Sequence, residues 1–417
     1  MSITKPVLLD ETFSSALSIL NHEMKRQADY TEIMAAEAAQ KIRTENLAEL
    51  QHLIVNGGAE DILPIGDQLI VGYNWGNNEY DFEWDSVHIP EYVDLEDGEQ
   101  HNGLILQSHW AHPLEVPFDP PEAAYAFINP VASGETVHFT VGTSTGDESD
   151  VGKSFQFTAS VALLTGAQLM ISMADNATLA GRTVTVYESA KATEPLMTTT
   201  LAVGSAGTDL GTFGSATRDP ATGWNSTGPA RYGYNRYRDS WYRQWLNNTG
   251  AGETWYEPTS MWDRPPANWK TVNGFETGFS QDFLSIIAPT KIQVATNTII
   301  DGGVTDVMYD KFFLPSLQNM NISPQAADIE GPTWEYWQRA LGRTTYWGTG
   351  SSNIHPALIS RRLDAKTTAC SVRLRSAVRG FTSYAWYVNS TGYANYNGYV
   401  SVAYRARPAC VITSTNH

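Results

Sequence analysis

The sequence has little of three things that mark common protein classes, namely cysteine, charge and long apolar runs. Two Cys in 417 residues are too few for a disulfide scaffold, and the wide spacing of Cys370 and Cys410 matches no zinc or redox motif. Two buried thiols are the favoured interpretation, and a single bridge between neighbouring strands is the alternative. No segment approaches the roughly eighteen apolar residues of a membrane span, so no membrane insertion is expected.

The first ten residues also lack a positively charged region followed by an apolar stretch. A secretory signal peptide has that pattern, so synthesis in the cytoplasm is expected. Hydrophobic residues make up 42% of the chain, which is enough for two or three cores. Charged residues are only 17% and aromatic residues 11%, a balance typical of β-rich extracellular or virion proteins.

The formal net charge of −18 argues against nucleic-acid binding, because a nucleic acid attracts basic surfaces. One local exception is a run in which arginines alternate with Tyr and Trp. Its arginines are Arg231, Arg236, Arg238 and Arg243. Such a mixture can stack bases, but arginine packed against aromatic rings inside a fold is the favoured interpretation. No nucleic-acid partner is predicted.

A helical rhythm covers Asp10 to Val55. Phe13, Leu17, Leu20 and Met24 are spaced by four, three and four residues, and the same rhythm returns at Leu47, Leu50 and Ile54. A narrow apolar stripe on a polar helix can be buried by copies of itself, so residues 1–58 are predicted to be an oligomerisation and attachment segment. Packing of the stripe on the protein's own β domain is the alternative.

The period changes to two after residue 59, which predicts a β-sandwich or jelly-roll-like domain over residues 59–210. The predicted strands are 68–73, 137–141, 155–161, 168–173 and 183–187. Thr165 and Gly166 are expected to form a tight hairpin between two of them. Residues 211–417 are mixed, with short helices predicted at 240–247, 281–287 and 333–341. The predicted fold class is therefore α+β, mainly β.

Clustered acids and histidines are candidate ligands for a transition metal or for calcium. The metal candidates are Asp85, His88, His109, His112 and Glu115. The calcium candidates are Asp301, Asp306 and Asp310, and separately Asp147, Glu148 and Asp150. Neither set has the spacing of a known motif, so ordinary histidines and solvated acidic turns are favoured, and no metal or cofactor is predicted.

Catalysis is not predicted either. The chain has no G-x-S-x-G, no H-E-x-x-H and no phosphate-cradling glycine loop. Paired carboxylates from distant parts of the chain remain open, and the ones to inspect are Asp282, Asp310, Glu330 and Glu335. The protein is therefore predicted not to be an enzyme.

The most informative stretch runs from Ala365 to His417, which contains no Asp or Glu. Between Phe381 and Tyr404 it becomes a run of Tyr, Asn, Ser, Thr and Gly on a few apolar positions. Tyrosine supplies contact area at low conformational cost, and Asn and Ser supply adaptable hydrogen bonds, as in antibody binding sites. This composition predicts a ligand-binding surface, and the alternative is that these are simply the last strands and loops of a β-rich domain.

Several motifs in this region carry a family resemblance. They include Val372-Arg373-Leu374-Arg375-Ser376-Ala377, Trp386-Tyr387-Val388 and Tyr404-Arg405-Ala406-Arg407-Pro408-Ala409-Cys410. With them the chain resembles a family of phage and prophage proteins that carry a C-terminal C-type-lectin-like domain. The stretch is also similar to the variable region of retroelement-diversified proteins such as the phage major tropism determinant. The resemblance implies a C-type-lectin-like ligand-binding domain over 211–417, with a variable region at 378–407.

In such proteins a rigid frame holds the displayed side chains. The frame would include Arg375, Arg379, Trp386, Gly392, Arg405 and Pro408. The displayed, ligand-binding positions would be Val378, Phe381, Ser383, Tyr384, Tyr387, Asn389, Tyr393, Asn395, Tyr396, Asn397, Tyr399, Ser401, Val402 and Tyr404. The triplets that coordinate calcium in sugar-binding C-type lectins are absent, so calcium-dependent sugar binding is not implied.

The resemblance implies a virion protein exposed on the phage particle, most simply the receptor-binding tip of a tail fibre. Its partners would be a protein or glycan on the bacterial surface, and other virion proteins through the N-terminal region. A homo-oligomer, with a trimer favoured, would supply avidity. A capsid decoration or head-fibre protein is the alternative, and a polysaccharide depolymerase is a further one.

Overall fold

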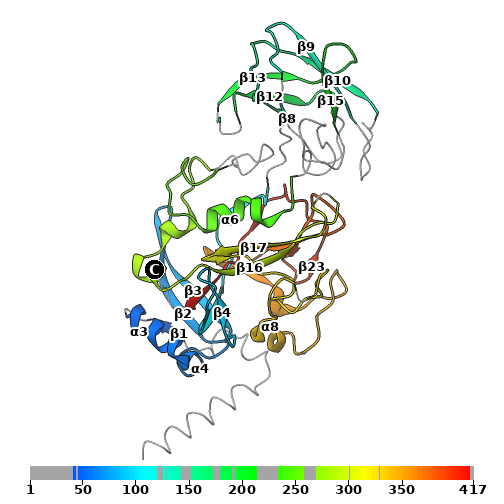
Figure 1. Ribbon diagram of the computed structural model, residues 1–417. Helices are drawn as coiled ribbons and strands as arrows, with labels where there is room; N and C mark the ends of the chain where they lie inside the picture. The colour runs from blue at the N-terminus through cyan, green and yellow to red at the C-terminus, as the bar shows by residue number, and fades with distance from the viewer. Residues whose placement is uncertain are drawn as a thin grey trace, which may run out of the picture.

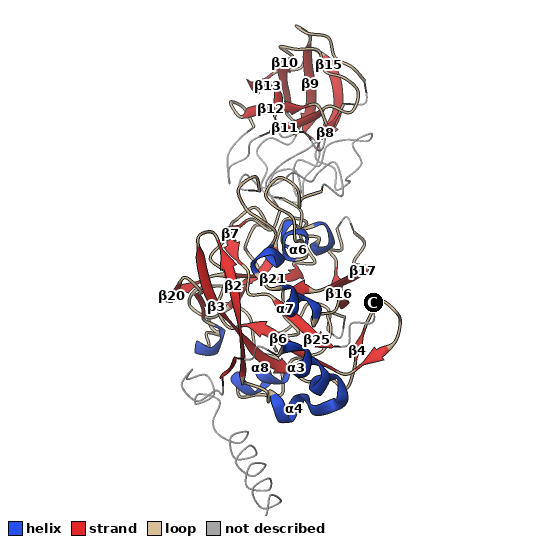
Figure 2. Cartoon of the chain, turned by 90° about the vertical axis from the view of Figure 1, so that its left-hand side faces the viewer, coloured by secondary structure: helices blue, strands red, loops and turns tan. Residues whose placement is uncertain are grey.

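The computed structural model describes residues 41–43, 46–119, 125–127, 129–141, 152–171, 179–189, 192, 194–213, 233–257, 269–299, 301–327 and 329–413. Of the described residues, 37% are in strands and 14% in helices, which confirms the predicted α+β, mainly β class. Figures 1 and 2 show a larger body that carries the labelled helices and a smaller body built of strands. A lectin-like fold of residues 211–417 stays a prediction.

A six-stranded sheet forms the centre of the larger body. Its order is β1 (Lys41–Arg43), β2 (Gln68–Trp75), β3 (Asn78–His88), β6 (Gly103–Ser108), β25 (Ala409–Thr413) and β18 (Phe312–Phe313). Strand β25 comes from the end of the described chain, yet it lies inside the sheet, where Val411 pairs with Ile105 and Cys410 with Phe312. The early and late parts of the sequence therefore build one sheet together.

A five-stranded sheet carries the C-terminal region. Its order is β23 (Ala394–Asn395), β22 (Ala385–Val388), β21 (Val372–Ala377), β24 (Tyr404–Arg405) and β7 (Glu115–Val116). Three two-stranded ribbons complete the strands of the larger body: β4 (Val93–Asp94) with β5 (Gln100–His101), β16 (Thr290–Ala295) with β17 (Thr305–Asp310), and β19 (Ser360–Arg362) with β20 (Ala365–Cys370).

The helices of the larger body are short. They are α3 (Leu47–Leu53), the π-helical turn η1 (Ile54–Gly58), α4 (Ala59–Ile62), α6 (Trp241–Leu246), α7 (Gln281–Ser285) and α8 (Glu335–Ala340), with 3₁₀ turns η2 (Tyr237–Asp239), η3 (Phe275–Gly278) and η4 (Pro356–Leu358). Serine caps begin two of them, because Ser240 Oγ accepts from Arg243 N–H and Ser280 Oγ from Phe283 N–H. The three helices predicted after residue 211 are thus present, each within a residue or two of its predicted bounds. None of the helices in the described ranges has the length and apolar character that crossing a bilayer requires.

The N-terminal prediction holds only in part. Residues 47–62 are helical, but Lys41–Arg43 is a strand, and Phe13, Leu17, Leu20 and Met24 lie outside the described residues. Leu47, Leu50 and Ile54 are buried in the core of the larger body. The alternative interpretation is therefore correct for this half of the stripe, which packs on the protein's own sheet and is not available for self-association.

The smaller body is a sandwich of two four-stranded sheets. One has the order β14 (Ala202–Val203), β10 (Ser154–Thr158), β9 (Thr136–Val141), β15 (Thr208–Phe213), and the other β13 (Pro195–Thr200), β12 (Thr183–Tyr187), β11 (Gln168–Ile171), β8 (Tyr125–Ala126). Alternate residues of β9, β10 and β12 point inward, as period-two sequences do. The predicted hairpin at Thr165-Gly166 is wrong, because β10 and β11 belong to different sheets and the turn crosses between them.

The predicted domain limits of 59–210 and 211–417 need correction. Strands β2, β3 and β6 share a sheet with β25, and their side chains share a core with those of residues 237–412. The sandwich has its own core, formed by residues from Phe127 to Leu210. Residues 125–213 are therefore an insertion in the larger domain. Local periodicity misses this because strand pairing across the length of a chain leaves no local signal.

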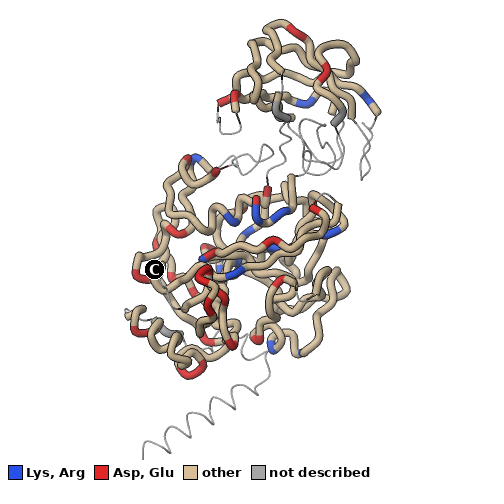
Figure 3. The backbone as a smooth tube through the Cα atoms, viewed as in Figure 1, with Lys and Arg blue, Asp and Glu red and all other residues tan. Residues whose placement is uncertain are grey.

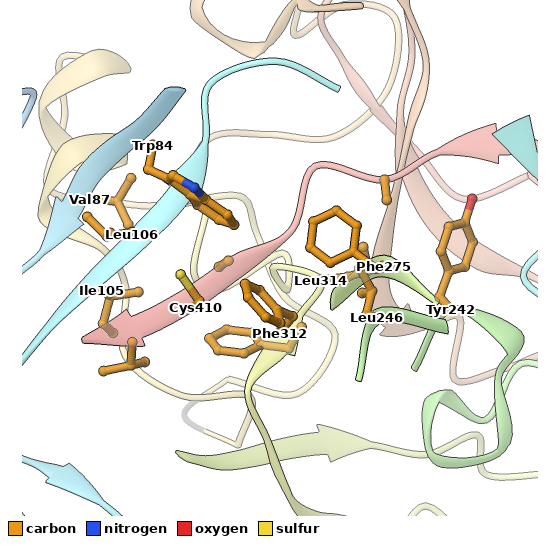
Figure 4. Packing of buried hydrophobic residues seen from close by; sticks show 14 of the residues in the cluster. Trp84, Val87, Ile105, Leu106, Tyr242, Leu246, Phe275, Phe312, Leu314 and Cys410 are labelled. Carbon is orange, nitrogen blue, oxygen red and sulfur yellow. The ribbon is translucent and has the colours of Figure 1, made fainter. Parts of the chain in front are cut away.

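Aromatic rings fill the core of the larger domain beside β25. Figure 4 shows Trp84 and Phe312 beside this strand, which itself carries Cys410. The Phe312 ring stacks on Phe279 with centroids 5.7 Å apart, and Trp84 lies 5.9 Å from Phe312. Cys370 and Cys410 are both buried and free, so the favoured interpretation of two thiols is correct. Burial raises the pKa of Cys410 well above its ordinary value and that of Cys370 to about 11.

Candidate ligand-binding face

The predicted binding region follows β21 and forms the outer part of the five-stranded sheet. Strand β22 pairs with β21 through Val372–Val388 and Arg373–Tyr387, and with β23 through Tyr387–Asn395. Between these short strands the chain forms turns at 378–384 and 396–403. The face is therefore made mostly of loops whose conformation depends on the side chains beneath them.

Most of the predicted displayed positions reach the surface. Phe381 and Tyr396 are 40% and 53% exposed, and Asn397 is exposed as well. Nine others are half-buried: Tyr384, Tyr387, Asn389, Tyr393, Asn395, Tyr399, Ser401, Val402 and Tyr404. The remaining two, Val378 and Ser383, are buried, so the prediction of display is wrong for them. Val378 joins the core, and Ser383 lies beneath the neighbouring segment, whose Val400 N–H donates to its carbonyl.

The aromatic side chains of the face form three groups. Phe381, Tyr384 and Tyr399 are linked by centroid distances of 4.8 and 4.5 Å. Tyr396 packs edge-on against the buried Trp386 at 5.9 Å. Because aromatic contacts hold the rings in place, little rotamer entropy is left to lose when a ligand binds.

The third group surrounds a buried arginine. Tyr387 and Tyr404 stack with centroids 4.5 Å apart and an interplanar angle of 16°, and the Arg373 guanidinium lies 4.4 Å from the Tyr404 ring. Arg373 is fully buried, and burial lowers its pKa to about 10. Burial likewise raises the pKa of Tyr387, with the neighbouring Tyr404 adding to the effect.

Arg373 fixes the backbone of the outer loops. Its Nη1 donates to the carbonyls of Ala385 and Gly398 at 2.8 and 3.2 Å. Its Nη2 donates to those of Tyr399 and Val402 at 2.8 and 3.1 Å. A planar fork of donors thus holds four carbonyls together. Two of them, those of Gly398 and Tyr399, also accept from backbone N–H groups. Arg373 is a supporting residue that the sequence analysis did not assign to the frame.

Asn235 supports the other turn in the same manner. Its Nδ2 donates to the carbonyls of Phe381 and Tyr384 at 2.8 and 2.7 Å, and its N–H donates to Thr382 O. Its Oδ1 accepts from Asn297 Nδ2 at 2.9 Å. The sequence places these residues far apart, and only the fold brings them together.

A neighbouring turn extends the face beyond the predicted region. Thr298 donates to the Arg379 carbonyl from both its N–H and its hydroxyl, and Arg379 Nη2 donates to Gly303 O. The same turn carries the exposed Ile299 and Val304, at 37% and 53%. Apolar surface from Ile299 and Val304 therefore adjoins the loop that carries Phe381.

The expected frame residues are largely in place. Arg375, Trp386, Gly392 and Pro408 are buried, and Arg405 pairs with Glu115 at 3.2 Å. Gly392 has φ = +91°, and a Cβ there would lie 2.5 Å from His355 O. Only glycine fits such a position without strain.

The acids proposed for calcium have arginine partners instead. Arg236 forms a double contact with Asp306 at 2.7 Å, and Arg243 pairs with Asp310 at 2.8 Å. Asp301 accepts from the Tyr234 hydroxyl and from Asn297 Nδ2. The interpretation as solvated acidic turns is wrong for these three, because Asp306 and Asp310 are buried and Asp301 is bound. Asp147, Glu148 and Asp150 lie outside the described residues.

These ion pairs also account for the arginine-aromatic run. Arg236, Arg238 and Arg243 all lie close to the acids of β17, with Arg238 3.6 Å from Asp306, and Arg231 lies outside the described residues. Figure 3 shows the basic residues gathered near α6 and β16–β17, whereas acids mark the α3–α4 end. The arginines of this run therefore hold η2 and α6 against β17 through charge-assisted hydrogen bonds.

The residues proposed for a metal have separate structural roles. His109 Nδ1 lies 2.8 Å from Asp85, which Arg407 also contacts at 3.0 Å. His112 lies in the aromatic core, and Glu115 pairs with Arg405. Desolvation lowers the pKa of His88 to about 4. The acids and histidine that do approach one another within the described ranges, Asp97, Glu99 and His101, are at the surface of the β4–β5 ribbon and already bind one another.

The four carboxylates considered for hydrolysis also have different surroundings. Glu330 is buried and accepts from Ser376 Oγ and Ala295 N, and burial raises its pKa. Asp310 is held by Arg243, and Glu335 pairs with Arg339. Asp282 is exposed in the first turn of α7. Three of these groups are engaged in holding the fold.

Comparison with known proteins shows that part of this domain is similar to a family of unknown role. Residues 222–414 match the family described as a domain of unknown function, DUF6273. No curated protein and no solved structure matches the chain. The matched segment includes the whole candidate face, but it excludes β2, β3 and β6, which complete its central sheet.

Proposed function

We propose that this protein is a receptor-binding protein of a phage virion, and that its C-terminal face binds a protein or glycan on the bacterial surface. The observation that carries the proposal is the contrast between exposed Phe381, Tyr396 and Asn397 and the fixed backbone beneath them. Aromatic and amide groups on a preorganised loop bind with a small entropic penalty. The phage origin rests on the sequence resemblance.

Single sites of this kind are often weak, since the exposed area of a few side chains is small. Several copies on one particle raise the effective concentration of the second and later contacts, so a weak single site gives firm attachment. The trimer and attachment through the N-terminal region remain part of the proposal.

The experiment is binding of fluorescently labelled protein to a panel of bacterial strains, measured by flow cytometry. The triple variant Phe381→Ser, Tyr396→Ser, Asn397→Ala should lose at least about tenfold of the binding, while its melting temperature stays within about 2 °C, because exposed side chains contribute little to stability. Leu164→Ser is the matched control, since Leu164 is 65% exposed on the sandwich and should not matter. Full binding by the triple variant would contradict the proposed face.

The site of attachment is a separate question. Immunogold labelling of the phage particle should place the protein at the tail tip. Label on the capsid would instead establish the alternative of a head fibre or decoration protein that displays the same face.

A further inference from the structure

The outermost loop of the candidate face contains a dipeptide that can react with itself. In an Asn-Gly pair the glycine nitrogen can approach the asparagine amide closely, because glycine has no side chain in the way. The chain has four such pairs, and they begin at Asn56, Asn102, Asn273 and Asn397. Asn397 alone lies in the stretch from Ala365 to His417, which contains no Asp or Glu. Conversion of its amide to an acid would therefore give this stretch its first negative side chain.

Two of the pairs are held by regular structure and by hydrogen bonds of the amide group. Asn56 Nδ2 donates to His52 O at 2.6 Å, and Asn102 Nδ2 donates to Val55 O at 2.8 Å. The glycines that follow them belong to the π-helical turn η1 and to strand β6. Ring closure needs rotation of the asparagine backbone, and helical or strand geometry opposes that rotation. Both pairs are therefore protected in the folded protein.

The third pair is held at the nitrogen that would attack. Gly274 N–H donates to Gly250 O at 2.9 Å, and Asn273 Oδ1 accepts from Gly252 N–H at 3.0 Å. Both groups must leave their backbone partners before they can react with each other. This pair is therefore protected as well.

The fourth pair has neither kind of protection. Asn397 is exposed and belongs to no helix or strand. Gly398 N–H has no hydrogen-bond acceptor among the residues that the structure describes, whereas Gly398 O accepts from Arg373 Nη1 and from Ala385 N–H. The Tyr387 hydroxyl donates to Asn397 Oδ1 at 3.2 Å. Within the described ranges, the Nδ2 group that would leave has no hydrogen-bond partner.

We propose that Asn397 is a site of spontaneous deamidation in the folded protein, and that the Tyr387 hydroxyl assists the reaction. The Gly398 nitrogen attacks Asn397 Cγ, and the hydroxyl donates to the oxygen on which negative charge develops. A bond forms between Gly398 N and Cγ, the Cγ–Nδ2 bond breaks, and ammonia leaves with the Gly398 amide proton. Water then opens the cyclic imide to aspartate or isoaspartate. The net reaction consumes one water and releases one ammonia.

The product changes the charge of the face. A carboxylate at position 397 would lie beside the stacked Tyr387 and Tyr404 rings, since Tyr387 contacts both groups. The face would therefore become more negative as the protein ages. The reaction follows from the local geometry and does not depend on the proposed receptor-binding role.

The test follows the full chain in mildly alkaline buffer, with digestion and mass spectrometry of the peptides that contain the four pairs. Asn397 should deamidate at least about fivefold faster than the other three, because each of those must first lose a hydrogen bond. In concentrated urea the four rates should converge, since the difference comes from the fold. The proposal is overturned if Asn397 reacts no faster than Asn273 in the folded chain, or if its advantage is the same in urea.

Two tyrosine variants test the assisting hydroxyl. Tyr387→Phe keeps the ring but removes the donor, so deamidation of Asn397 should slow about threefold. Tyr393→Phe removes a hydroxyl of the same face that makes no hydrogen bond to Asn397 in the described structure, and the rate should stay unchanged. An unchanged rate in Tyr387→Phe would overturn the role of the hydroxyl. Should Tyr387→Phe fail to fold, the comparison of the four pairs in the unaltered chain still decides whether Asn397 is the site.

Discussion

The imidazole Nε2 of His112 lies 3.0 Å from the hydroxyl of Tyr73, inside the aromatic core. Leu114 N–H donates to His112 Nδ1 at 3.0 Å, so Nδ1 is unprotonated and Nε2 donates its proton to Tyr73. Protonation of Nδ1 would place its N–H against the N–H of Leu114, so that two donors would face each other. Desolvation is the main reason that the pKa of His112 falls to about 3, and Arg405 lowers it further.

This histidine should make the protein sensitive to mild acid. The pKa is about 3 in the folded state and about 6.5 in the unfolded chain, so the unfolded state takes up a proton first as the pH falls. His112 should therefore lower the free energy of unfolding by about 2 kcal/mol between pH 7.5 and pH 5. Urea unfolding at both pH values measures this.

In His112→Gln that pH dependence should shrink, whereas His52→Gln, at an exposed helical position, should leave it unchanged. An identical pH dependence in His112→Gln and the unaltered protein would show that His112 is not the group responsible.

Arg373 should be the residue on which the face depends most. Replacing it with Met removes four hydrogen bonds to loop carbonyls and should lower the free energy of unfolding by at least about 3 kcal/mol. Denaturant titration measures the loss, and Arg361→Met, at an exposed arginine, should change it by less than about 0.5 kcal/mol. If Arg373→Met and the unaltered protein had equal free energies of unfolding, water would be replacing the guanidinium without loss of stability.

Two glycines of the same face offer a sharper comparison. Gly392→Ala should destabilise by roughly 2 kcal/mol or more, because φ is +91° and His355 O occupies the space. Gly380→Ala should be nearly neutral, since nothing lies within 4 Å of the added methyl group. Thermal unfolding of both variants, scored together, checks the backbone of this region. Similar melting temperatures for Gly392→Ala and Gly380→Ala would contradict the backbone conformation described here for Gly392.

The inserted sandwich should unfold separately from the larger domain. None of the 13 Trp lies within residues 125–213, so tryptophan fluorescence does not report on the sandwich directly, whereas circular dichroism reports on both domains. The two signals should therefore give different urea transitions. Coincident fluorescence and circular dichroism curves would instead show that the two domains unfold as a single cooperative unit.

Matched core variants assign the transitions. Val186→Ala in the sandwich should shift only the component seen by circular dichroism, and Val388→Ala should shift the fluorescence transition. Each loses buried methyl groups, so a shift of about 1 to 3 kcal/mol is expected.

Prediction from the sequence succeeded where the signal was local. Period-two strands such as β9 and β12 and the serine-capped helix α6 lie where the pattern places them. The exposure of Phe381 and Tyr396 follows from composition, since a segment without acids and rich in Tyr and Asn is typical of a contact surface.

It failed where residues distant in sequence meet. The pairing of Val411 with Ile105 makes the sandwich an insertion. The pairing of Arg236 with Asp306 shows that an acid interpreted as part of a solvated turn belongs to a structural ion pair. Burial of Val378 and Ser383 depends on the turn that Asn235 holds from another part of the fold. Neither periodicity nor composition predicts these contacts.

The interior place of β25 has a consequence for biosynthesis. The sandwich is complete once residue 213 has left the ribosome, and it can fold while translation continues. Until residues 409–413 are made, the central sheet lacks β25, the strand that pairs with both β6 and β18. A nascent chain therefore exposes the edge of β6 after residue 108 and that of β18 after residue 313. Termination of translation before residue 409 would leave both edges for chaperones or proteases to recognise.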